Sequence, residues 1–130
     1  RNWELKMNKK AKTKALFMSL SEKARDGKFI VVDSMTLSVP KTKEFVKMLS
    51  GFRSKVEGFG KKQIFLMPKK DEILSRVSRN IPGMNPTLAS SLNVYDVLNA
   101  DTMVVLKDSL PVIEKTYLRE KQKATVERKK

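Results

Sequence analysis

The stretch Phe29-Ile30-Val31-Val32 is a run of four apolar residues that follows a polar residue and stops at Asp33. The same pattern returns at Ile64-Phe65-Leu66-Met67 and at Met103-Val104-Val105-Leu106. Short apolar runs without alternation are typical of strands covered on both faces, as in a parallel sheet between helices. We therefore predict strands over these three runs and a fourth, shorter strand around residues 87–89.

Segments of helical composition lie between the predicted strands. Gly27 is a suitable residue to follow the first helix, Gly51 would close the second, and Pro111 falls in the first turn of the last. The predicted helices are 8–25, 40–49, 71–77, 94–98 and 108–122, and the segment 52–62 is predicted to be a mobile loop.

The alternation of strands and helices predicts an α/β fold with three layers. We expect a mostly parallel, Rossmann-like sheet of three or four strands with helices on both faces. Because such a sheet is thin, we also expect that an N-terminal strand belonging to it is missing from the supplied sequence. A chain of 130 residues suits a single domain. We assign residues 1–122 to this domain, with 1–7 as a basic arm, and residues 123–130 to a basic tail.

Net charge is the clearest indication of a partner. The chain has 28 Lys and Arg residues against 14 Asp and Glu, a formal net charge of +14 at pH 7. Such an excess destabilises a compact protein unless an anionic partner neutralises it, and nucleic acid is the usual partner of a basic domain this small. Residues 1–14 carry six basic residues and one acidic, whereas residues 80–110 carry one basic and three acidic. This uneven distribution favours a dedicated binding surface.

The basic residues gather in a few clusters. The predicted first helix carries lysines at its N-terminal end, where the helix dipole disfavours cations by about 0.3–1 kcal/mol each, so we interpret the cluster as a phosphate-binding site instead of a solvated face. Trp3 in the basic arm could stack on a base, but packing against the domain is favoured. The predicted RNA-binding residues are Arg1, Lys6, Lys9, Lys10, Lys12, Lys14, Lys41, Lys43, Arg76 and Arg79.

Residue types needed for most catalysis are absent. The sequence contains no Cys and no His, which removes thiolate and imidazole chemistry and nearly all zinc and transition-metal sites. Gly58-Phe59-Gly60 precedes a predicted strand, so it does not fit a dinucleotide-binding loop, which follows one. The acidic residues Asp96, Asp101 and Asp108 lie beside helix ends, where capping explains them. We predict no enzymatic activity, no cofactor, no metal and no membrane partner.

Several segments in order resemble one known family. Ser21 to Lys28, running into the first predicted strand, resembles bacterial-type large-subunit ribosomal protein four (the universal L-four family). The resemblance continues over Pro40 to Glu44, Arg79 to Gly83, Leu92 to Asp96 and the strand 102–107, and covers about residues 1–118.

The resemblance implies an α/β globular domain joined to a long extended loop that threads through ribosomal RNA. Residues 1–3 look like the segment after that loop, so the family's N-terminal strand, helix and loop would lie outside this sequence. The family's basic helix after the loop maps onto Lys6 to Lys14. The implied function is a structural constituent of the large ribosomal subunit in the cytoplasm or an organelle. Its implied partners are large-subunit ribosomal RNA and neighbouring large-subunit ribosomal proteins.

Three other functions stay open at this point. The same surface could bind the chain's own messenger RNA and regulate its expression, as some members of the family do. A small α/β enzyme with a phosphorylated substrate would need a titratable pocket at the strand ends. A basic protein-interaction module would bind in a way that survives high salt.

Overall fold

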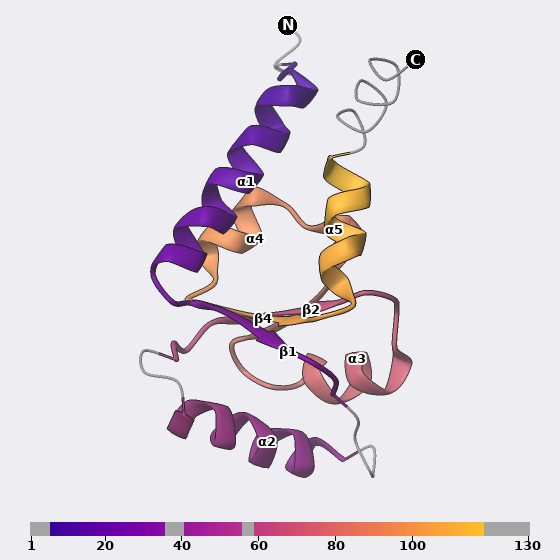
Figure 1. The fold of residues 1–130 in the computed structure, drawn as a ribbon. Coiled ribbons are helices and arrows are strands. Elements are labelled where there is room, and N and C mark those ends of the chain that lie inside the picture. Colours follow the sequence, from indigo (N-terminus) through magenta and orange to yellow (C-terminus); the bar gives the residue numbers. More distant parts are fainter. Residues whose placement is uncertain (1–5, 36–40, 56–58, 119–130) are drawn as a thin grey trace, which may run out of the picture.

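The computed structural model describes residues 6–35, 41–55 and 59–118. The helices are α1 (Lys9–Arg25), α2 (Thr42–Lys55), α3 (Glu72–Arg79), α4 (Val94–Asn99) and α5 (Ser109–Tyr117). The strands are β1 (Phe29–Val32), β2 (Gln63–Met67), β3 (Met84–Leu88) and β4 (Thr102–Leu106), and a 3₁₀ turn (Ala89–Ser91) follows β3. Figure 1 shows α1, α4 and α5 on one face of the sheet and α2 and α3 on the other. The prediction of a three-layer α/β fold is confirmed.

All four strands of the described sheet are parallel, in the order β1-β4-β2-β3. The last of these four strands in the sequence, β4, therefore occupies a central position. β4 pairs with β1 from Phe29↔Met103 to Val32↔Leu106, and it pairs with β2 on its other side. The additional N-terminal strand that we expect for this sheet stays a prediction.

The sheet separates two apolar clusters, one on each face. Leu16 of α1, Val97 of α4 and Ile113 of α5 cover one face, and the other cluster includes Phe45 of α2, whose ring meets that of Phe65 edge to face, with the centroids 6.1 Å apart. Successive residues of β2 and β4 belong alternately to the two clusters. This explains why their sequences are continuously apolar, because both faces of these strands are covered.

Residues beside two of the helices, Gly27 after α1 and Asp71 before α3, fix where these helices end and begin. Gly27 has φ +69° after α1, and its N–H and that of Lys28 donate to the carbonyls of Ala24 and Lys23, which closes the helix. The carboxylate of Asp71 accepts hydrogen bonds from the N–H groups of Ile73 and Leu74 at the start of α3.

Three predicted boundaries were wrong, of which the first two concern α2 and β3. α2 does not end before Gly51 but continues to Lys55, because Phe52 packs against the same apolar cluster as Phe45 and Leu49 and extends the apolar stripe by about one turn. The segment 52–62 is thus helical at its start, and residues 56–58 lie outside the described residues. β3 begins at Met84, three residues before the predicted position, and tolerates Pro86 because it is an edge strand of the described sheet.

The last helix is shorter than expected. α5 ends at Tyr117, and the N–H of the following Leu118 donates to the carbonyl of Glu114. Residues 119–130, which include the rest of the expected helix and the expected basic tail, lie outside the described residues. The first five residues of the expected basic arm do so too.

Candidate nucleic-acid interface

The first basic group of the described residues lies on α1 and just before it. Its members are all exposed: Lys6, Lys9, Lys10, Lys12 and Lys14. The buried residues of α1 are Leu16 and Ser19, so packing against the domain starts near the middle of the helix. Figure 1 shows the N-terminal half of α1 extending away from the sheet, beyond α4. The lysines from Lys9 to Lys14 therefore sit on the projecting part of α1, residues 9–15, which we call the α1 arm and which is distinct from the basic arm predicted over residues 1–7.

Helical spacing distributes these lysines around the arm. Lys10 and Lys14 are four residues apart and share one side of α1. Lys9 and Lys12 share another side, which is the side that Leu16 buries further along the helix. The projecting part of α1 thus carries lysines even on the side that packs against the domain further along the helix. This distribution suits a helix that has phosphate groups on more than one side.

The electrostatics of the arm are unusual for a helix N-terminus. Asn8 at the N-cap makes no side-chain capping hydrogen bond, and the first turn contains no acidic residue. Among the described residues the ion pairs are Lys28–Asp26, at 3.4 Å, and Lys107–Asp33, at 3.0 Å. No described carboxylate therefore pairs with the lysines of the arm, and their charge adds to the positive end of the helix dipole.

The other half of α1 holds the arm in a fixed direction. The ammonium group of Lys23 donates a hydrogen bond of 2.6 Å to the carbonyl oxygen of Ala100, which follows α4. Leu16 is buried and Leu20 partly buried in the cluster on this face. An arm anchored in this way presents its lysines without a large loss of entropy on binding.

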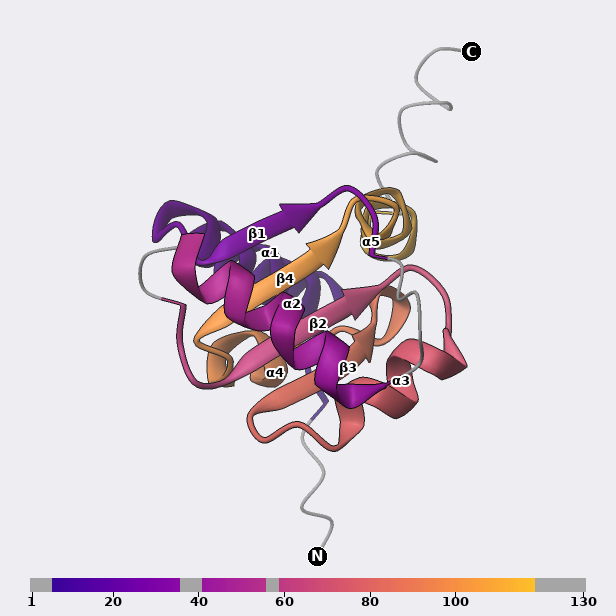
Figure 2. The same cartoon turned by 90° about the horizontal axis from the view of Figure 1, so that it is seen from below.

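The second basic group lies on the opposite face of the domain. Its members are all exposed: Lys41, Lys43, Arg76 and Arg79. Figure 2 shows the N-terminal end of α2, where Lys43 lies, beside α3, which carries the two arginines. The structure thus brings these four residues to one face and separates them from the α1 arm by the sheet. One RNA segment could contact both groups only by passing around the domain.

Two predicted residues cannot be placed. Arg1, a predicted RNA-binding residue, and Trp3, for which packing was favoured, lie outside the described residues. Both assignments stay predictions.

The acidic residues have roles that differ from those predicted. α4 is capped by Asn93, whose side chain accepts from the N–H of Asp96, so the expected capping by Asp96 itself was wrong. The carboxylate of Asp101 instead accepts a 2.9 Å hydrogen bond from the N–H of Lys62, and this bond lowers the pKa of Asp101 below its usual 3.8. Asp108 occupies the N-cap of α5 without a side-chain capping bond.

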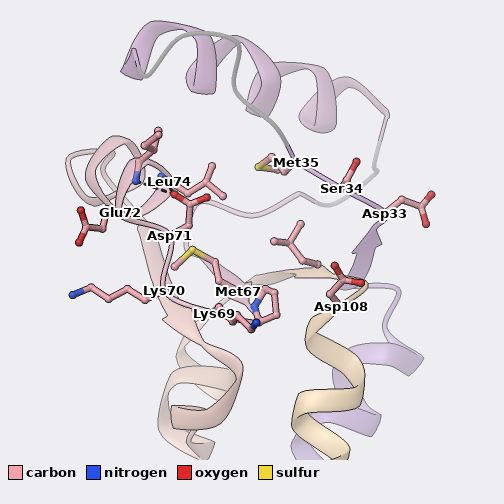
Figure 3. Close-up of a pocket in the computed structure, with 13 residues that line it drawn as sticks. Asp33, Ser34, Met35, Met67, Lys69, Lys70, Asp71, Glu72, Leu74 and Asp108 are labelled. Carbon is pink, nitrogen blue, oxygen red and sulfur yellow. Dashed lines mark hydrogen bonds between the residues drawn. The ribbon is translucent and has the colours of Figure 1, made fainter.

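Sequence reasoning missed a cleft of about 660 Å³ at the carboxyl ends of β1, β2 and β4, which Figure 3 shows. Its walls come from three segments that are far apart in the sequence, 33–35, 67–74 and 106–108. No group of three or more carboxylate, His or Cys residues in the described part of the chain could hold a metal ion. Within the same residues, no helix combines the length and the apolar character needed to cross a membrane.

Comparison with known proteins finds one family. The model of the Ribosomal protein L4/L1 family matches residues 1–116. A protein of Natranaerobius thermophilus named "Large ribosomal subunit protein uL4" is 38% identical over 117 residues, which are 90% of this chain and 54% of that protein. A protein of the same name from Phocaeicola vulgatus is 40% identical over 88% of this chain and 53% of its own length. The chain spans about half the length of the curated relatives it matches.

Proposed function

The chain belongs to the ribosomal protein L4/L1 family, and on that premise we propose that it is a structural constituent of the large ribosomal subunit that binds large-subunit ribosomal RNA. The names of its relatives support the assignment to the large subunit. Its RNA ligand is inferred from the net charge of +14 and from where the basic residues lie. The membership also favours a structural role over the alternative of a small enzyme.

The observation that carries the RNA-binding proposal is the α1 arm. Four lysines, Lys9, Lys10, Lys12 and Lys14, are exposed on a helix end that leaves the domain, without a described carboxylate beside them. Such a cluster costs the isolated protein stability, and contact with phosphate groups offsets that cost. Each contacted phosphate releases counterions, so the binding constant falls steeply as salt rises.

The α2–α3 group extends the proposed interface to the other face. Lys41, Lys43, Arg76 and Arg79 would contact a second RNA segment, and a protein between two segments would fix their relative position. RNA of this kind is recognised mainly by shape and backbone, so we expect little base specificity from these contacts. Nothing in the part of the chain that the structure describes favours messenger RNA as the ligand.

Replacing the four lysines of the arm by alanine tests the proposal. Alanine is the best helix former, so α1 should stay folded, which circular dichroism checks. We expect weaker binding to purified large-subunit ribosomal RNA. The slope of log K against log salt should decrease by up to about 3 to 4, since each lost phosphate contact removes about 0.7–0.9.

A matched control removes the same charge elsewhere. The control variant replaces four exposed basic residues outside both groups by alanine: Arg25, Lys61, Lys70 and Lys115. It should keep most of the affinity and of the salt slope. An equal loss in both variants would show that only net charge matters, and an unchanged affinity in the arm variant would remove α1 from the interface.

A further inference from the structure

The cleft at the carboxyl ends of the strands lies where ligands commonly bind in open α/β sheets. β1 and β2 continue into α2 and α3 on one face, whereas β4 continues into α5 on the other, so the connections diverge around the opening. Its volume of about 660 Å³ is in the range of pockets that bind a small molecule or a few side chains.

The lining of the cleft is apolar at its base. Met35, Met67 and Leu74 are buried there, and Leu106 is partly buried. Methionine side chains adapt their shape to different partners. Ile73 also lines the cleft and is 51% exposed, although it is a large apolar residue in the first turn of α3. An apolar side chain of a partner could therefore be buried here against residues already in place.

Charge around the cleft is opposite to that of the protein. Four carboxylates and two ammonium groups line it, in a chain with a net charge of +14, and one of these carboxylates, that of Asp33, is paired with Lys107 at 3.0 Å. Figure 3 shows Asp71 and Asp108 on opposite sides of the opening, with Met35 and Met67 between them. Neither Glu72 nor Asp108 makes a side-chain hydrogen bond or ion pair with the described residues.

The same carboxylates argue against RNA or another anion as the occupant. A phosphate would bind at the N-terminal N–H groups of α3, but Asp71 already accepts from two of them, those of Ile73 and Leu74. Asp108 holds the corresponding position at the start of α5. Both carboxylates would repel a phosphate, whereas they would attract a cation.

We propose that this cleft is a docking site for a cationic segment of a protein partner, one in which Lys or Arg residues flank a large apolar side chain. The apolar side chain would enter between Met35, Met67 and Ile73. The cations would lie at the rim, near Glu72 and Asp108. This proposal rests on charge complementarity and cleft geometry and is independent of the ribosomal assignment.

Nuclear magnetic resonance of the ¹⁵N-labelled chain tests the proposal with three capped pentapeptides. Arg-Lys-Leu-Lys-Arg should shift the amide signals of residues 33–35 and 70–74 in a saturable way and leave those of residues 9–14 unchanged. Glu-Glu-Leu-Glu-Glu and Arg-Lys-Gly-Lys-Arg, which lack the cations or the apolar side chain, should bind much more weakly. Inorganic phosphate and a short RNA serve as probes for an anion site.

Two variants separate docking from nonspecific charge. The double variant Glu72→Gln with Asp108→Asn should weaken binding of the first peptide about three- to tenfold, since exposed charge pairs contribute modestly. Neither change removes a described hydrogen bond. The control Glu22→Gln with Glu114→Gln changes the net charge equally, at exposed positions of α1 and α5 that are not part of the cleft, and should bind as the parent does.

A further variant tests the apolar contact without disturbing the core. Ile73→Ser should weaken peptide binding and leave the fold intact, because half of this side chain is exposed in the free protein. The proposal is overturned by any of three results: no saturable shift of the cleft amides at millimolar peptide, equal binding of the three peptides, or a stronger response to phosphate or RNA than to the cationic peptide.

Discussion

Removing charge from the start of α1 should stabilise the protein while weakening its binding to RNA. Lys9 and Lys10 are the first two residues of the helix, with no capping side-chain bond and no acidic residue in the first turn. A cation there costs about 0.3–1 kcal/mol. Replacing both by Gln, which has nearly the helix propensity of Lys, should raise the free energy of unfolding by about 0.6–2 kcal/mol. The midpoint of thermal unfolding should rise by about 2–8 °C.

A control pair isolates the helix dipole from the net charge. Arg25→Gln and Lys115→Gln remove the same charge, but both residues lie exposed in the last turn of a helix, where cations are favourable. This variant should be no more stable than the parent, or slightly less. Urea denaturation of the three proteins in low salt, followed by fluorescence and circular dichroism, measures the difference.

A lower and a higher stability of the Lys9 and Lys10 variant lead to opposite conclusions. If the Lys9 and Lys10 variant is less stable than the parent, the two ammonium groups make contacts within the fold, and the interpretation of α1 as an arm for phosphate groups is refuted. If it is more stable and binds ribosomal RNA more weakly, the two lysines lower stability in the free protein and serve the partner.

Three further perturbations test contacts inside the domain. Tyr117→Phe removes a hydroxyl whose single proton lies between the backbone carbonyls of Leu92 and Ser90, and the change should cost about 1 kcal/mol. Burial raises the pKa of Tyr117 above its usual 10.0, so the stabilising contribution of the hydroxyl is complete below that value and is lost as pH rises through the higher folded pKa. Urea midpoints of the variant should therefore fall less at alkaline pH than those of the parent. Asp101→Asn should make the stability fall less in acid. The hydrogen bond from the Lys62 N–H lowers the pKa of Asp101 in the folded protein, so its carboxylate stabilises the fold above the usual pKa of 3.8, and this contribution is lost as pH falls through the folded pKa. Gly60→Ala should destabilise the fold by about 1–3 kcal/mol in urea denaturation, since a Cβ there would collide with the Asp101 side chain while the Gly60 N–H is bonded to Thr102.

The sequence predicts those elements whose signals are local. The runs at 29–32, 64–67 and 103–106 are strands because each is short, apolar and bounded by polar residues or proline. Two glycines show where local signals stop being sufficient. Gly27 ends α1 with a positive φ, whereas Gly51 lies within α2, because Phe52 after it finds a place in the core. Whether a glycine closes a helix thus depends on a tertiary contact that the local pattern does not contain.

The same difference between local signals and tertiary contacts applies to the candidate sites. The lysines of 9–14 form a cluster because neighbours in sequence are neighbours on a helix, so sequence alone predicts it. Lys43 belongs to α2, which lies on the opposite face of the sheet from α1, and this follows from the path of the chain, which a charge count cannot give. The cleft was missed for the same reason, since its three segments meet only when β4 is placed between β1 and β2.

The central position of β4 also has a consequence for how the protein is made. β1 and β2 are separated by β4 in the sheet, so they cannot pair with each other as they leave the ribosome that synthesises them. Until residues 102–106 emerge, each keeps an unpaired edge, and pairing over such sequence distances is intrinsically slow. We therefore expect the nascent chain to stay open until its last strand is available and then to close in one cooperative step, with a period of exposure in which a chaperone would be of most use.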